Sequence, residues 1–238
     1  MKTKISAIFL SVLLVLSGCS TIQNASNKAK GGTIGGVAGG ALGAGIGALI
    51  GKGKGAAIGA AIGAVVGAGT GVLIGHKMDK AKKAALAAGA EAEVTKDENG
   101  ISYVKVNFPA GILFASGKSD LTADAQSSLA TFAAGLESDM DLYINGYTDN
   151  VGFRGKTAEQ SKELNKELSV KRASSVSSFL MTKGVKGSQF KEVTGYGEEN
   201  PVGDNSTAAG REQNRRVEIF IAPSQDMINS AKKEAGEA

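Results

Sequence analysis

The chain has little of the chemistry on which most enzymes and metal proteins depend. Its 238 residues contain one cysteine, one histidine and no tryptophan, and aromatic residues make up only 5% of the chain. A single thiol, Cys19, excludes an internal disulfide and a zinc site built from several cysteines. A single imidazole, His76, excludes a metal site of several histidines and leaves a Ser-His-Asp triad without material. We therefore expect no catalytic residue, no metal site and no cofactor.

An excess of charge of one sign is also missing. The chain has 27 Lys and Arg residues against 23 Asp and Glu residues. Two of the basic residues, Lys2 and Lys4, fall in a segment that we expect to be removed, which leaves 25 against 23. No basic block is interleaved with aromatic residues, so the sequence argues against nucleic acid as a partner.

The first eighteen residues have the order of a secretory signal peptide. Two lysines precede the uncharged run Ile5–Leu16, and the small residues Ser17 and Gly18 follow it. Leu16–Cys19 resembles the lipobox of bacterial lipoproteins. The resemblance implies cleavage before Cys19 and acylation of its thiol, by palmitate among other chains, which would anchor the protein stably. The alternative is an ordinary signal peptide with a chance cysteine. Ser20, where many lipoproteins of the inner membrane carry Asp, favours the outer membrane.

A regular ladder of glycines follows a short polar tether, residues 19–30. Glycine occupies every fourth position, which aligns these residues along one ridge of a helix and lets two helix backbones approach closely. Only Lys52 and Lys54 interrupt the apolar residues between them, so Gly31–Gly51 and Gly55–Gly75 are each long enough to span a membrane. The glycines are Gly31, Gly35, Gly39, Gly43, Gly47, Gly51, Gly55, Gly59, Gly63, Gly67, Gly71 and Gly75.

This segment, residues 31–75, resembles the glycine zippers of bacterial surface lipoproteins. We predict a transmembrane helical hairpin that contacts outer-membrane lipid and offers a surface for homo-oligomers. The alternative is a flexible Gly/Ala linker, because glycine disfavours a helix in water. Residues 76–99 are expected to form a linker helix, His76–Glu93, that leaves the membrane, with a domain boundary in the charged stretch Lys96–Gly100.

The remainder of the chain, residues 100–222, has the pattern of a globular domain. Apolar residues alternate near Val104–Phe108, Leu142–Gly146, Phe190–Gly197 and Arg216–Ala222, as in half-buried strands. Helical spacing follows Thr122, an expected N-cap, and recurs over about Glu159–Lys183. The predicted fold is α/β (α+β), in the order βαβαββ, with both helices on one face of a mixed sheet. Residues 223–238 are expected to be a flexible tail.

The second predicted helix carries one charged residue on its apolar side. On a helical wheel Arg172 points into the half that holds the apolar residues, and Asn165 points within about 20° of it. A buried arginine needs a partner or an anionic ligand. A structural salt bridge, or an arginine whose charged end reaches solvent, is the alternative.

Several motifs in this region together resemble the OmpA-like peptidoglycan-binding domain. The resemblance covers about Ile101–Ala222, and the motifs are Ile112–Phe114, Gly146–Gly152, Leu168–Val176, Gly195–Glu198, Pro201 and Gly210–Val217. It implies binding of the diaminopimelate of uncrosslinked stem peptides. The implied binding residues are Thr148, Asp149, Asn165, Arg172 and Arg215.

The implied ligand suits these side chains. Diaminopimelate ends in a carbon that bears an ammonium and a carboxylate. Asp149 can accept hydrogen bonds from the ammonium, Arg172 can donate two to the carboxylate, and Asn165 can serve either group. Two features depart from the family pattern: Tyr147 stands where histidine is usual, and about eight extra residues lie around Phe153–Gln160.

The resulting prediction is non-covalent anchoring of the outer membrane to the peptidoglycan wall, with the C-terminal domain in the periplasm. An enzyme is the first alternative, in which Asp149, Asp120 or Glu198 would pair for glycan cleavage, but their spacing does not support it. The second alternative is an oligomeric pore built from the glycine ladder. A proton-driven stator is disfavoured because neither apolar run contains an acidic residue.

Overall fold

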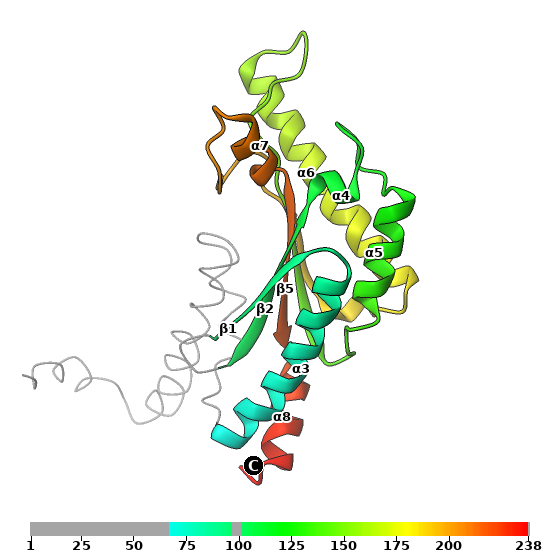
Figure 1. Cartoon of the computed structure of the whole chain (residues 1–238), viewed down its shortest axis with the longest axis vertical. Coiled ribbons are helices and arrows are strands. Elements are labelled where there is room, and N and C mark those ends of the chain that lie inside the picture. The colour runs from blue at the N-terminus through cyan, green and yellow to red at the C-terminus, as the bar shows by residue number, and fades with distance from the viewer. Residues whose placement is uncertain (1–66, 97–100, 238) are drawn as a thin grey trace, which may run out of the picture. The chain divides into compact units, whose positions relative to one another are not determined.

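The computed structural model describes residues 67–96 and 101–237, which form part of a single contact unit. The predicted signal peptide, Cys19, the tether and most of the glycine ladder lie outside the described residues, and so does the predicted pore. In order along the chain (Figure 1), the elements are α3 (Ala68–Ala87), β1 (Glu91–Lys96), β2 (Ser102–Pro109), α4 (Ala110–Leu113), α5 (Ala123–Ala133), β3 (Met140–Gly146), α6 (Ala158–Thr182), η2 (Gly187–Gln189), β4 (Phe190–Gly195), α7 (Ala208–Asn214), β5 (Arg216–Pro223) and α8 (Gln225–Glu234).

The strands form one mixed sheet in the order β1-β2-β5-β3-β4. Strand β5 is antiparallel to both β2 and β3, whereas β3 and β4 run parallel and are connected through the long helix α6. Helices α5 and α6 cover one face of the sheet, as Figure 1 shows. The predicted mixed sheet with helices on one face is therefore confirmed.

The core lies between this sheet and its helices. Phe108 of β2 meets Phe132 of α5 edge to face, with ring centroids 5.6 Å apart. Thr122 caps α5 as predicted, because its hydroxyl accepts a hydrogen bond from the Ala125 backbone N–H at 3.1 Å. Other fully buried core side chains include Val104, Val106, Leu129, Leu142, Ile144, Ile219 and Ile221.

Helix α3 extends the domain beyond the predicted boundary. It begins at Ala68, inside the range predicted for the second membrane span, and Ile74 and Met78 are fully buried in the core. The linker helix predicted over His76–Glu93, within residues 76–99, is therefore wrong from Ala88 onward, because α3 ends at Ala87 and β1 begins at Glu91. The helix ends at Ala87, and Gly89 takes a positive φ of 80° to reverse the chain. Ala92 and Val94 of β1 then pack against the core.

The prediction of a flexible tail is wrong for residues 225–234, which form α8. Met227 and Ile228 are buried, and the helix packs against α3. The carboxylate of Glu237 accepts hydrogen bonds from the Gly69 backbone N–H at 3.0 Å and the Thr70 hydroxyl at 2.7 Å, and so caps the start of α3. In the part of the chain that the structure describes, no helix is both long and apolar enough to span a membrane.

Candidate ligand-binding pocket

Two glycines bring the carboxyl ends of β3 and β4 against α6. A Cβ atom on Gly146 would overlap the backbone carbonyl of Ser169, and one on Gly195 would overlap the backbone nitrogen of Val170. Only glycine permits this approach. The backbone N–H of Thr148 then donates to the Gly197 carbonyl at 2.8 Å, which holds the segment after β3 beside the helix.

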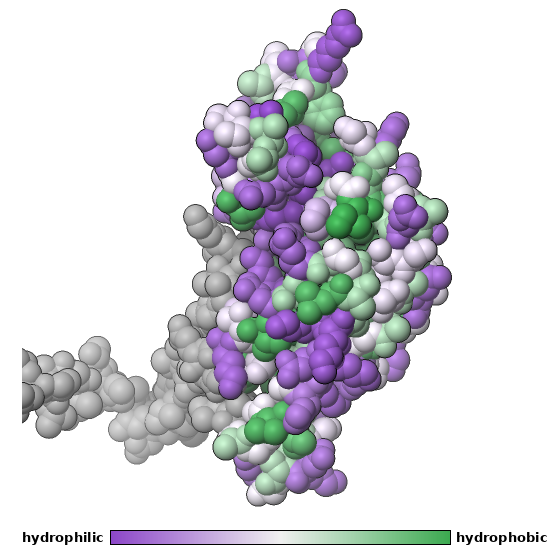
Figure 2. Space-filling model, in the orientation of Figure 1, coloured by the Kyte–Doolittle hydropathy of each residue, from purple (hydrophilic) through white to green (hydrophobic). Residues whose placement is uncertain are grey.

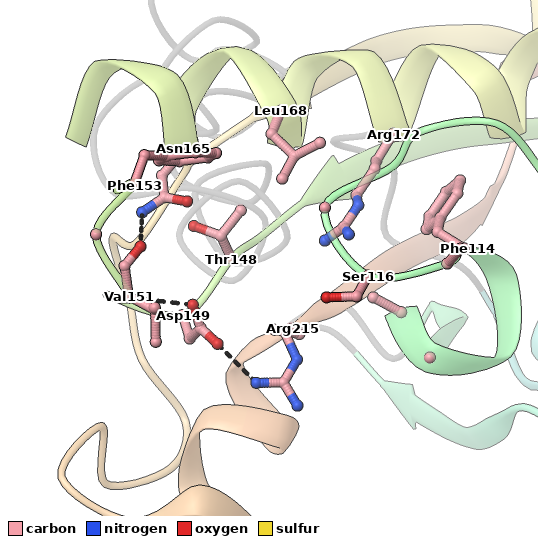
Figure 3. Close-up of a pocket in the computed structure, with 15 residues that line it drawn as sticks. Phe114, Ser116, Thr148, Asp149, Val151, Phe153, Asn165, Leu168, Arg172 and Arg215 are labelled. Atoms are coloured by element: carbon pink, nitrogen blue, oxygen red, sulfur yellow. Dashed lines mark hydrogen bonds and ion pairs between the residues drawn. The ribbon is translucent and has the colours of Figure 1, made fainter. Parts of the chain in front are cut away.

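This segment forms one wall of a pocket of about 720 Å³. Residues 110–117, from α4 and the loop after it, form the opposite wall, and α6 and Arg215 complete the lining (Figure 3). Figure 2 shows hydrophilic residues gathered in the hollow between α7 and the helices α4 and α6. One carboxylate, Asp149, and two guanidinium groups, Arg172 and Arg215, line the pocket, so its charged side chains carry a net charge of +1.

Asp149 and Arg215 form an ion pair within this pocket. The Arg215 Nη1 lies 2.6 Å from the Asp149 Oδ2, and the Val151 backbone N–H donates to the Asp149 Oδ1 at 3.1 Å. The Asp149 carboxylate is therefore held in place, yet 39% of the Arg215 side chain remains accessible. Because Arg215 follows α7 directly, that short helix positions this partner.

Arg172 reaches the pocket from α6 with few partners of its own. Its Nε donates to the Lys118 carbonyl at 3.0 Å, and its guanidinium lies 5.2 Å from the centre of the Phe114 ring. The terminal nitrogens donate to no residue in the described ranges, and in Figure 3 they point into the pocket. Burial and the positive charge of Arg215 lower the pKa of Arg172, although Asp149 opposes the shift. An incoming carboxylate would relieve this cost.

Asn165 and Thr148 complete the group predicted from the sequence. The Asn165 Nδ2 donates to the Val151 carbonyl at 3.2 Å, which ties the helix to the loop after Asp149. The hydroxyl of Thr148 is buried and has no hydrogen-bond partner in the described ranges. The pocket thus brings together Thr148, Asp149, Asn165, Arg172 and Arg215, although their roles in binding stay a prediction.

Other sequence-based alternatives differ from the observed arrangement. Asp149 pairs with Arg215, and no salt bridge joins Asp149 to Arg172 among the described residues. The three carboxylates considered for catalysis do not share a site, because Asp120 and Glu198 line two other hollows. No group of three or more His, Cys, Asp or Glu side chains within residues 67–96 and 101–237 is arranged to hold a metal ion.

Arg216 lies outside the pocket and braces the fold. Its Nε donates to the Glu218 Oε1 at 3.0 Å, and its guanidinium stacks 3.7 Å from the centre of the Tyr147 ring. Tyr147 stacks in turn on Tyr196, with centroids 5.3 Å apart. Burial and the charge of Glu218 raise the pKa of Tyr147, so its ring stays neutral. The tyrosine found in place of the usual histidine therefore belongs to a cation–π stack.

Sequence reasoning did not identify the apolar side chains of the pocket or the Ser116 hydroxyl. Phe114 and Ser116 line it from the loop after α4, and Phe153 and Leu168 line it near Asn165 (Figure 3). Leu168 belongs to α6, but the buried positions in this half of the helix are polar, namely Ser161, Asn165 and Ser169.

The N-terminal and the C-terminal part of the chain each match a known protein family. Residues 113–215 match the model of the OmpA family, and these residues contain strands β3 and β4 and every polar pocket residue predicted above. The C-terminal domain belongs to the OmpA family. Residues 1–79 match the YMGG-like Gly-zipper model, which overlaps α3 from its start at Ala68 to Asp79.

Individual proteins agree with this assignment. The probable lipoprotein YiaD of Escherichia coli is 37% identical over 154 residues, which cover 63% of this chain and 65% of YiaD. The peptidoglycan-binding protein ArfA of Mycobacterium tuberculosis is 42% identical over 83 residues, which cover 35% of this chain and 23% of ArfA. This chain therefore spans less than two thirds of the length of either relative.

A solved structure of a MotB-like protein from Desulfovibrio vulgaris supports the fold. The superposed region covers 65% of this chain and 98% of the MotB-like chain, with a TM-score of 0.53 and 24% sequence identity. The likeness concerns the sheet and its helices alone. The match to the OmpA family and the likeness in fold thus agree for the C-terminal domain.

Proposed function

We propose that the pocket binds the zwitterionic end of diaminopimelate in the stem peptides of peptidoglycan. The single observation that carries this proposal is the arrangement of Asp149, Arg172 and Arg215 around one pocket. In a ligand with both groups on one carbon, the ammonium is a partner for the Asp149 carboxylate. The ligand carboxylate is a partner for the terminal nitrogens of Arg172. The relative named as peptidoglycan-binding, ArfA, supports the same ligand class.

Each polar group then has a defined task. Arg172 donates to the ligand carboxylate, and Asp149 accepts from the ammonium while it keeps its bond to the Val151 backbone. Arg215 binds the Oδ2 of Asp149, the oxygen that Val151 does not use, and adds positive charge near the ligand carboxylate. Asn165 fixes the loop that carries Asp149, and Thr148 supplies a hydroxyl whose hydrogen-bonding capacity is unused.

The biological role in this proposal is anchoring. Acylation at Cys19 holds the N-terminus in the outer membrane, and the C-terminal domain binds peptidoglycan from the periplasm. The likeness to the lipoprotein YiaD supports the anchored end. Because the wall repeats its stem peptides, many weak contacts sum to a strong attachment. The role is binding and not catalysis, and incubation with purified wall should release no fragments.

A sedimentation assay with purified sacculi tests the proposal. The full chain, kept soluble in detergent micelles, should pellet with sacculi, and free meso-diaminopimelate should compete. Asp149→Ala and Arg172→Ala should each abolish most of the pelleting. Asp79→Ala and Arg154→Ala are matched controls, because both residues are exposed and neither lines the pocket. Folded Asp149→Ala and Arg172→Ala chains that pellet as well as the parent would refute it.

A further inference from the structure

The extra residues after Asp149 are not a loose surface loop where they meet the pocket. The Val151 N–H donates to the Asp149 carboxylate, and the Val151 carbonyl accepts from Asn165. Two residues later, the Phe153 N–H donates to the Ser161 hydroxyl at 3.0 Å. These three bonds join the loop to the binding residues and to α6, so the backbone of Phe153 is held beside the pocket.

Phe153 and Leu168 form an apolar boundary between two hollows. Both line the charged pocket, and both also line an adjacent hollow of about 210 Å³ together with Leu164. Figure 3 shows the Phe153 ring extending from the loop along α6 toward Leu168. Phe153, Leu164 and Leu168 therefore form an apolar strip that leads out of the pocket along α6, where Leu164 and Leu168 are only half buried.

The chemistry of the ligand makes this strip informative. In the proposed function, the ammonium and carboxylate at one end of diaminopimelate bind Asp149 and Arg172. The next atoms of diaminopimelate are three methylene groups. Methylene groups gain free energy when they leave water for an apolar surface. A ligand that carries only the charged head would leave the strip unused.

We infer that Phe153, supported by Leu168, is a specificity-determining residue that binds the methylene chain next to the charged head. This inference rests on the proposed function. The extra loop thereby makes the pocket select amino-acid heads on a long aliphatic chain over short amino acids. Phe153 contacts no charged group of the ligand, so its contribution depends on the chain alone.

Calorimetric titration of the full chain in detergent with three probes tests the inference. Glycine carries only the charged head, D-norleucine adds an aliphatic chain without a second charge, and meso-diaminopimelate is the proposed ligand. The variant is Phe153→Ala. Phe179→Ala is the matched control, because Phe179 on α6 is also only partly buried but lines neither hollow.

The parent should bind D-norleucine about five-fold more tightly than glycine, the gain expected for partial burial of a short alkyl chain. Phe153→Ala should remove this preference and weaken meso-diaminopimelate to a similar degree while glycine affinity stays unchanged. Phe179→Ala should keep the preference. If Phe153→Ala retains the parent's preference, or weakens all three probes equally, the inference is overturned and the proposed function stands. If the parent binds no meso-diaminopimelate, both are overturned.

Discussion

Two arginines in this domain are equally buried and have opposite surroundings. Arg172 is 4% exposed and Arg216 is 3% exposed. Around Arg216, the carboxylate of Glu218, two backbone carbonyls and the ring of Tyr147 occupy the guanidinium. Around Arg172, one backbone carbonyl and the ring of Phe114 are the partners in the described part of the chain.

The difference shows that burial alone does not separate a structural arginine from a binding one. A buried charge costs free energy unless nearby groups compensate it. The protein supplies that compensation to Arg216 and leaves most of it for a ligand to supply at Arg172. The region around Arg216 should therefore respond to mutation through stability, and the pocket should respond through binding.

The largest expected effect is on stability, from Arg216→Ala. Among the residues that the structure describes, this change leaves the buried Glu218 with only the Lys105 ammonium, at 3.4 Å, as an ionic partner, and it removes the stack on Tyr147. We expect a loss of about 3 kcal/mol in the free energy of unfolding, measured by urea denaturation. The double variant Arg216→Met with Glu218→Leu should recover much of this loss. A single variant as stable as the parent would remove the contrast between the two arginines.

Arg172→Ala should show the reverse behaviour. Its guanidinium has no carboxylate partner within residues 67–96 and 101–237, so the free energy of unfolding should change by no more than about 1 kcal/mol. Binding of meso-diaminopimelate should weaken roughly ten- to hundred-fold, because a charge-assisted hydrogen bond is worth ~1.5–3 kcal/mol. Denaturation and titration on the same sample test both parts. A large loss of stability with intact binding would make Arg172 structural.

Arg172→Lys sharpens the comparison by keeping the charge. Lysine lacks the planar pair of donors that matches a carboxylate, so binding should weaken by about 1 kcal/mol, or five-fold. The affinity should fall between those of the parent and Arg172→Ala in titration with meso-diaminopimelate. Equal affinity of the lysine variant and the parent would show that charge alone is sufficient.

Thr148→Val should have the smallest effect on the unbound domain. The hydroxyl is buried without a partner among the described residues, so its replacement by a methyl group of similar shape should leave stability unchanged or raise it by up to ~1 kcal/mol. If the ligand uses the hydroxyl, affinity should fall nonetheless. Thermal denaturation and titration separate the two effects, and a destabilised variant would contradict the assignment.

Much of the core follows from local pattern. Alternating apolar residues predicted strands β2, β3, β4 and β5, and the capping threonine and helical spacing predicted α5 and α6 close to their observed ends. The contributions of α3, β1 and α8 were not predicted. These segments are rich in Ala, Lys and Glu and resemble a solvated linker or tail in isolation. Their few apolar residues, such as Met78 and Ile228, become core only because the two helices pack together.

The sequence by itself determined the family, the order of most elements and the inward direction of Arg172, because motif spacing and helical periodicity are local properties. Tertiary structure decided which charges meet. Asp149 and Arg215 are 66 positions apart, and they pair because Gly146 and α7 bring two loops to one end of the sheet. Arg215 and Arg216 are adjacent in sequence, yet only Arg215 lines the pocket, since successive side chains at the start of a strand point in opposite directions.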